Sequence, residues 1–183
     1  MRTIVILSFC FAMGSSSVFA QEAGKLRAGL EIGCLLPLEG GGGVLGAIEL
    51  KYNLQNNMNV GLKTEVAGFL KHESYDAVTS FFSATYDYYF YSTCNRISYF
   101  VGVGLGYYYC KAWDMYYRNY NLDLNSKFNN PAFFIRSGFE LGKFRTSLTY
   151  NLIRKPSEIS PHSRKNDYLA LNIGFYLGGG KWK

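Results

Sequence analysis

The sequence predicts an all-β fold, an eight-stranded antiparallel up-and-down transmembrane β-barrel. Three observations predict it: apolar side chains recur at every second residue along most of the chain, the apolar rows carry no charge, and long connections alternate with short ones. The length of 183 residues fits a single domain. Hydrophobic residues make up 48% of the chain and charged residues only 17%, which argues against a disordered protein.

The first twenty residues have the pattern of a secretory signal peptide. Arg2 precedes an apolar run over residues 4–13, and Val18-Phe19-Ala20 forms a cleavage site. The run is too short to span a membrane as a helix. A buried N-terminal helix is the alternative interpretation. We expect cleavage after Ala20, which leaves residues 21–183 as the barrel domain.

Eight segments of the remaining chain alternate apolar and polar residues with a period of two, which is the period of a β-strand. In each segment one face is apolar and free of charge. The segments are 26–36, 44–54, 60–70, 82–90, 99–109, 133–141, 146–152 and 169–177. A soluble sandwich or a lipocalin-like barrel would show the same alternation, with its apolar face turned inward.

Three features favour the inverse arrangement, in which the apolar face contacts lipid. Tyrosines lie near the segment ends, as in the aromatic girdles of membrane barrels. They are Tyr52, Tyr86, Tyr88, Tyr107, Tyr109 and Tyr150. The number of segments is even, and the connections 37–43, 55–59, 71–80, 91–97, 110–131, 142–143 and 154–166 alternate long with short. A closed barrel also pairs every backbone N–H and C=O, which hydrocarbon requires.

The opposite faces of the segments carry ten charged side chains, five basic and five acidic. They are Arg27, Glu31, Glu49, Lys51, Lys63, Glu65, Asp87, Arg136, Glu140 and Arg145. Charges inside a narrow barrel must be paired, so we expect a neutral salt-bridge network in the lumen. Catalytic carboxylates are the alternative, but neighbouring cations oppose the protonated form that a general acid needs. The expected same-strand pairs are Arg27/Glu31, Glu49/Lys51, Lys63/Glu65 and Arg136/Glu140.

Glycines also face the predicted lumen. Gly102, Gly104 and Gly106 leave room for long neighbours such as Arg136. Because the interior of an eight-stranded barrel is filled by side chains, we expect no wide aqueous pore.

Two predicted surface loops carry side chains suited to binding. The connection 110–131 holds aromatic residues that suit a protein or glycan ligand, although they can equally extend the strands as a rim. The connection 154–166 holds cations that suit lipopolysaccharide phosphates, although a solvated loop explains them as well. The aromatic residues are Trp113, Tyr116, Tyr117 and Tyr120, and the cations are Arg154, Lys155, Arg164 and Lys165.

Catalytic and metal-binding patterns are weak in this sequence. A lipid hydrolase of the Ser-His-acid kind needs a histidine, and the two present, His72 and His162, both lie in predicted loops. Cys34, Cys94 and Cys110 remain after signal-peptide removal, at a spacing typical of neither a disulfide scaffold nor a zinc site. We expect no enzymatic activity, no metal and no cofactor, and the disulfide state of the cysteines stays open.

The net charge of +6 and the pI of about 9.1 raise the question of nucleic-acid binding. In the predicted topology the lumen is neutral. Most of the excess positive charge lies at the end of the barrel where the strands are connected by short turns. The charge therefore forms no nucleic-acid patch, and we expect no nucleic-acid partner.

The last segment carries a resemblance to a known family. Residues 168–177 read YLALNIGFYL, with Asn172, Gly174 and Leu177 at the spacing of the family's assembly signal. Together with the signal peptide and the eight alternating segments, residues 25–178 resemble the small eight-stranded outer-membrane barrels of the OmpA/OmpX type. The segment GGGKWK follows where that family often ends in phenylalanine.

The resemblance implies a location in the outer membrane of a Gram-negative-type bacterium, in contact with outer-membrane lipid and lipopolysaccharide. Members of the family act as structural envelope proteins, adhesins or binders of host factors, and a few modify lipids. We predict a non-enzymatic outer-membrane barrel whose surface loops serve envelope integrity, adhesion or contact with a surface ligand. The alternatives are a lipid-modifying barrel enzyme and a soluble lipocalin-like binding protein.

Overall fold

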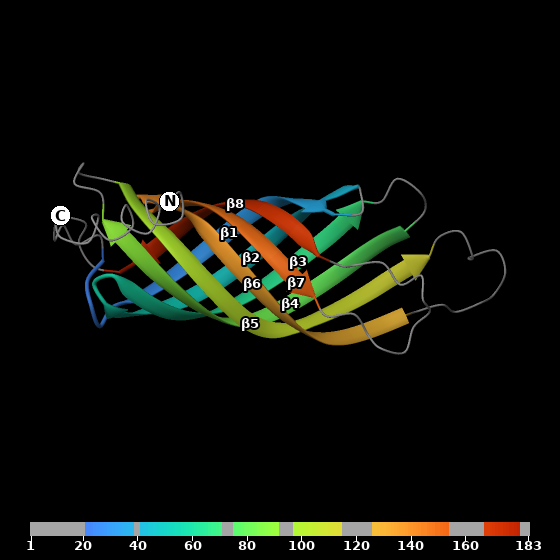
Figure 1. The fold of residues 1–183 in the computed structure, drawn as a ribbon, viewed down its shortest axis with the longest axis horizontal. Helices are drawn as coiled ribbons and strands as arrows, with labels where there is room; N and C mark the ends of the chain where they lie inside the picture. The colour runs from blue at the N-terminus through green and yellow to red at the C-terminus, as the bar shows by residue number, and fades with distance from the viewer. Residues whose placement is uncertain are drawn as a thin grey trace, which may run out of the picture.

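A computed structural model describes residues 21–38, 41–70, 75–91, 97–114, 126–153 and 167–179. These residues form eight β-strands: β1 (Leu26–Pro37), β2 (Gly42–Gln55), β3 (Met58–Leu70), β4 (Tyr75–Tyr91), β5 (Ile97–Asp114), β6 (Ser126–Leu141), β7 (Phe144–Ile153) and β8 (Tyr168–Gly178). Each strand pairs antiparallel with the next, and β8 pairs with β1, so the sheet closes into a barrel (Figure 1). The predicted eight-stranded antiparallel barrel is confirmed. The described residues include no helix that is long and apolar enough to cross a membrane.

Side chains alternate between the two faces of the barrel wall. On β1, Leu30 and Ile32 are 64% and 72% exposed on the outer face, whereas Arg27 and Glu31 are each 2% exposed. An apolar exterior around a charged interior is the inverse of a soluble barrel and suits a wall surrounded by hydrocarbon. This arrangement excludes the lipocalin-like alternative, in which the apolar face lines the interior.

Short turns lie at the end of the barrel where β1 begins and β8 ends (Figure 1). Asn56 and Asn57 connect β2 to β3, and Gly142 and Lys143 connect β6 to β7. Gly142 has a φ of +62°, a left-handed conformation that glycine adopts without steric strain. We refer to this end as the turn end and to the opposite end as the loop end.

The residues that precede β1 are tied to the turn end. Asn53 Nδ2 donates a hydrogen bond to the Glu22 carbonyl at 3.0 Å, and the Glu22 N–H donates to the Gly179 carbonyl at 3.1 Å. The Gln21 side chain accepts a hydrogen bond from Asn59 Nδ2 at 3.3 Å and is almost completely buried. Residues 21–24 therefore connect β2 and β3 to the end of β8.

Three strands extend further toward the loop end than the sequence predicts. β4 begins inside the predicted connection 71–80, while β5 ends and β6 begins inside the predicted connection 110–131. The predicted boundaries are wrong because backbone pairing continues, for example between Tyr75 and Asp114, where the apolar alternation has already stopped. Outside hydrocarbon a strand still needs backbone partners, but it no longer needs an apolar face.

Candidate functional site

The centre of the lumen is built around Arg136, which projects inward from β6. Its Nη2 lies 2.6 Å from Glu49 Oε1 on β2, and its Nε lies 2.8 Å from Asp87 Oδ1 on β4. Lys51 Nζ approaches the same carboxylates, at 2.6 Å from Asp87 Oδ2 and 3.4 Å from Glu49 Oε2. Gly102 of β5 lies between Asp87 and Arg136 in the strand register, and a Cβ at this position would collide with Asp87. The glycine therefore lets the guanidinium cross β5.

Arg145 on β7 joins this centre to the turn end of the lumen. Its Nη1 lies 3.2 Å from Asp87 Oδ2 and 3.1 Å from Glu140 Oε1. Glu140 also accepts hydrogen bonds from Arg27 Nη2 at 2.9 Å and from the Tyr89 hydroxyl at 2.7 Å. Two carboxylates thus hold side chains from β1, β4, β6 and β7 together.

Lys63 on β3 binds two further carboxylates. Its Nζ lies 2.8 Å from Glu65 Oε2 and 3.3 Å from Glu31 Oε2. Two tyrosines of β8 donate further hydrogen bonds to these carboxylates. The Tyr168 hydroxyl donates to Glu65 Oε1 at 2.7 Å, and the Tyr176 hydroxyl donates to Glu31 Oε1 at 2.7 Å. Each carboxylate therefore has a cation and a hydroxyl as partners, which offsets the desolvation of a buried charge.

All ten charged residues that the sequence assigns to the lumen are buried there and lie within 4.0 Å of an opposite charge. The expected same-strand pairs Glu49/Lys51 and Lys63/Glu65 are in contact. The other two expected pairs are wrong, because their arginines bind carboxylates across the barrel. Closure of the barrel brings distant strands within reach of a long arginine side chain. The interior tyrosines of the network were not singled out from the sequence.

The loop-side half of the lumen holds an apolar cluster that the sequence analysis missed. The Phe81 ring meets the Phe134 ring edge-on, with centroids 6.0 Å apart, and lies 6.2 Å from the Tyr108 ring. Gly104, opposite Phe134, leaves room for that ring, since a Cβ there would collide with it. The cluster comprises Leu35, Leu45, Ala67, Phe81, Tyr108, Ala132, Phe134, Ile153, Tyr168 and Ala170.

A signal for this cluster is present in the sequence. Near the loop end, several strands carry apolar residues at two successive positions, as in Leu35-Leu36, Phe81-Phe82 and Phe133-Phe134. Successive residues of a strand point to opposite faces, so both faces of the wall are apolar there. The outer apolar face contacts lipid, and the inner apolar face forms the interior cluster.

The lumen residues suit a structural role. Each of the five lumen carboxylates named above contacts a cation, and most of these contacts join different strands. In the described ranges, no group of three or more His, Cys, Asp or Glu side chains is placed to hold a metal ion. Cys34 is a free thiol exposed on the outer face, Cys110 belongs to β5, and Cys94 lies outside the described residues.

Of the predicted surface residues, the structure describes only the position of Trp113. It belongs to β5, opposite Asp76 of β4, so its predicted position in a loop is wrong and it extends the strand instead. The remaining predicted contact residues and both histidines lie outside the described residues. They are Tyr116, Tyr117, Tyr120, Arg154, Lys155, Arg164, Lys165, His72 and His162.

The extended parts of β4, β5 and β6 form a sheet that projects beyond β7 and β8 at the loop end (Figure 1). We call residues 75–82, 107–114 and 126–131 the projecting sheet. β7 ends at Ile153, opposite Ala132, so among the described strands the β6 segment 126–131 pairs with β5 alone. Pro131 suits this position, because proline is tolerated in edge strands. Among the described residues, the projecting sheet therefore has one edge without a strand partner, along residues 126–131 of β6.

Solved structures of other proteins share this architecture. Neisserial surface protein A matches with a TM-score of 0.63 at 15% sequence identity, over 85% of this chain and 97% of that chain. The outer membrane enzyme PagL matches with a TM-score of 0.57 at 9% identity, over 82% and 98%. The N-terminal β-barrel domain of Pseudomonas aeruginosa OprF matches with a TM-score of 0.56 at 14% identity, over 86% and 100%. No family model and no characterised protein sequence matches the chain. The protein therefore has the fold of the small eight-stranded outer-membrane β-barrels.

Proposed function

We propose that the protein is a non-enzymatic barrel of a bacterial outer membrane, exported by cleavage after Ala20, which acts through ligand contacts at its loop end. The observation that carries this proposal is the occupied lumen. An ion-paired network occupies the turn side and the centre of the lumen, and an apolar cluster that meets it at Tyr168 occupies the loop side. The charged and polar groups of these side chains already bind one another, so few of them are available to bind a solute in the lumen. The surfaces available to a partner therefore lie on the outside of the barrel.

The projecting sheet and the connection that follows β7 carry side chains suited to such a contact. Tyr107 is 59% exposed, and Asn129 is exposed on β6. Amphipathic rings and amides suit a polar ligand. The connection that follows β7 carries four cations. Guanidinium and ammonium groups bind phosphate strongly, so the favoured ligand is the phosphate-bearing part of lipopolysaccharide. Binding of this ligand would serve envelope integrity, and a protein or glycan of another surface is the competing outcome.

Binding of purified folded protein to lipopolysaccharide tests the loop contact. Replacing the four cations by glutamine is expected to weaken binding about tenfold, because each lost charge removes a phosphate contact. The variant combines Arg154→Gln, Lys155→Gln, Arg164→Gln and Lys165→Gln. A matched control, Lys25→Gln with Lys143→Gln, neutralises exposed cations near the turn end and should bind like the parent. Unchanged binding by the fourfold variant, or an equal loss in the control, contradicts the proposal.

The location is tested separately by cell fractionation and N-terminal sequencing. We expect the protein in the outer-membrane fraction, with a heat-dependent change in gel mobility, and a mature sequence that begins at Gln21. Recovery from the soluble periplasm, or a sequence that begins at Met1, contradicts this part of the proposal.

A lipid-modifying activity is the competing function, since PagL is an outer membrane enzyme of the same fold. Mass spectra of lipid A from cells with and without the protein distinguish the two. We expect identical spectra. A modified lipid A that disappears in the variant His72→Ala or His162→Ala would establish the enzyme instead.

A further inference from the structure

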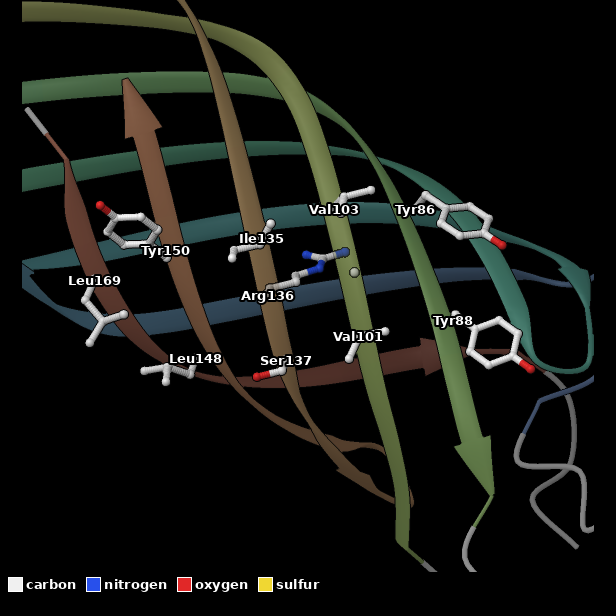
Figure 2. Close-up of a pocket in the computed structure, with 11 residues that line it drawn as sticks. Tyr86, Tyr88, Val101, Val103, Ile135, Arg136, Ser137, Leu148, Tyr150 and Leu169 are labelled. Atoms are coloured by element: carbon white, nitrogen blue, oxygen red, sulfur yellow. The ribbon is translucent and has the colours of Figure 1, made fainter. Parts of the chain in front are cut away.

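The strand alternation explains where most side chains of the barrel wall lie. The hollow over β4 to β8, lined by residues such as Tyr86 and Tyr150, belongs to the lipid-facing side (Figure 2), and the Arg136 guanidinium beside it binds Asp87 in the lumen. Gln21 does not follow from this alternation, because it precedes β1 and yet its side chain is buried at the turn end of the lumen. Its position therefore needs another explanation.

Hydrogen bonds connect Gln21 to the lumen network. Asn59 Nδ2 donates to Gln21 Oε1 at 3.3 Å and to the Tyr89 hydroxyl at 3.1 Å. The same hydroxyl accepts from Arg27 Nη1 at 3.4 Å and from Arg145 Nη1 at 3.1 Å. A chain of hydrogen bonds therefore runs from two buried guanidinium groups to Gln21.

Only one half of the Gln21 side-chain amide has a partner. Its Oε1 accepts the hydrogen bond from Asn59, whereas its Nε2 is buried without a hydrogen-bond partner in the part of the chain that the structure describes. A buried amide N–H without an acceptor is unfavourable, and native structures contain few such groups. The site therefore suits a residue that keeps the carbonyl of glutamine and lacks its NH2 group.

We propose that residue 21 of the mature protein is pyroglutamate, a lactam that forms from Gln21 and lies at the turn end of the lumen. This inference rests on the proposed cleavage after Ala20, which converts the backbone nitrogen of Gln21 into a free α-amine. It goes beyond the proposed ligand contact at the loop end, because it assigns a covalent modification at the opposite end of the barrel.

Ring formation needs only the atoms of Gln21. The α-amine nitrogen attacks Cδ, the bond between Cδ and Nε2 breaks, and the proton lost by the amine leaves with Nε2 as ammonia. Nothing is oxidised or reduced, and the reaction is intramolecular, so no second reactant has to reach a buried residue. The oxygen Oε1 remains as the lactam oxygen and can still accept a hydrogen bond from Asn59.

A neutral ring also suits the electrostatics of the turn end. An open glutamine at the start of the chain carries an α-ammonium charge, which is costly to bury without a counter-ion. Glu140, the carboxylate that the Tyr89 hydroxyl binds, is already paired with Arg27 and Arg145. Lactam formation removes the terminal charge, as other modifications of a chain terminus do.

Tandem mass spectrometry of the mature amino-terminal peptide tests the proposal. The full-length protein is expressed with its own signal peptide and recovered from the outer-membrane fraction. A lactam blocks stepwise chemical sequencing, whereas the mass spectrum reads both the first residue and the state of its side chain. We expect a peptide that begins at residue 21 and is lighter than the glutamine form by one ammonia.

Two controls detect cyclisation during handling. An isotope-labelled peptide QEAGKLR, with the sequence of residues 21–27, is added at cell lysis and should stay open. The variant Gln21→Asn keeps a side-chain amide but would have to close a strained four-membered ring, so it should retain its full mass.

The outcomes separate the ring from the cleavage. A chain that begins at Gln21 with the full glutamine mass overturns the ring alone. A chain that begins at another residue overturns the ring together with the proposed cleavage. Equal ring formation in the protein and in the added peptide assigns the ring to handling and also overturns the proposal.

Digestion with pyroglutamyl peptidase tests whether the ring lies in the lumen. The peptidase removes an accessible terminal ring, so we expect the folded protein to lose it about tenfold more slowly than the isolated amino-terminal peptide does. Asn59→Ala removes the donor to the ring carbonyl and should speed removal from the folded protein about fivefold. Asn57→Ala, in the turn between β2 and β3, is the matched control and should behave like the parent.

A heat-shift gel verifies that each variant is folded. Asn53→Ala, which frees the Glu22 carbonyl, is a second variant that should also speed removal of the ring. Equal rates for the folded parent and the isolated peptide overturn the placement of the ring in the lumen.

Discussion

Arg136 of β6 and Asp87 of β4 contact each other across Gly102 of the intervening strand β5, with Nε and Oδ1 2.8 Å apart. The ion pair therefore links strands that are not neighbours in the sheet. It depends on the absence of a side chain at residue 102, because a Cβ there would collide with the Asp87 carboxylate. One glycine thus permits a contact that holds three consecutive strands in register.

Gly102→Ala should destabilise the barrel by about 2 kcal/mol, since the added methyl group separates a buried ion pair and strains the lumen. Urea-induced unfolding in phospholipid vesicles measures the change. Gly46→Ala is the control, because a Cβ at Gly46 meets nothing within 4 Å. Equal unfolding midpoints for the two variants would show that the space at residue 102 is not critical.

Arg136→Met should destabilise the barrel by about 3 kcal/mol, because it leaves Glu49 and Asp87 with less compensating charge in a buried site. The same unfolding experiment applies. Lys25→Met is the control: its partner Glu22 is 3.9 Å away, and both side chains are more than half exposed. An exposed pair contributes little, so the control should differ from the parent by about 0.5 kcal/mol or less. A similar effect of both substitutions contradicts a structural role for the lumen network.

Asn53→Ala should loosen residues 21–24 without unfolding the barrel. The side chain of Asn53 holds the Glu22 carbonyl at 3.0 Å, and loss of one such hydrogen bond removes about 1 kcal/mol of local stability. Hydrogen exchange followed by mass spectrometry should show about fivefold faster exchange in this segment and unchanged exchange in the strands. Asn57→Ala in the β2–β3 turn is the control, and an equal acceleration there would contradict the assigned anchor.

The fold and the identity of the charged lumen residues follow from the sequence for a simple physical reason. Hydrocarbon excludes charge from one face of every strand, and the period of two then assigns each residue to a side. On β1 this rule places Leu30 and Ile32 outside and Glu31 inside, as the structure shows. The rule needs no knowledge of which strands are in contact.

The partners of the lumen charges do not follow from the sequence. Arg27 binds Glu140, which lies 113 residues away, and Tyr176 binds Glu31 at a separation of 145 residues. Such contacts depend on closure of the barrel and on its exact register shift, which no local pattern encodes. The position of Trp113 was missed for another reason. Beyond the lipid the strand continues with polar residues, and the alternation that marks it disappears.

Conductance in a planar phospholipid bilayer tests the central claim, that the lumen is a side-chain core and that ligands are met outside it. Folded protein should insert without a steady ionic current, because the ion-paired network and the apolar cluster together occupy the lumen. A stable, porin-sized current from the parent protein would contradict the claim.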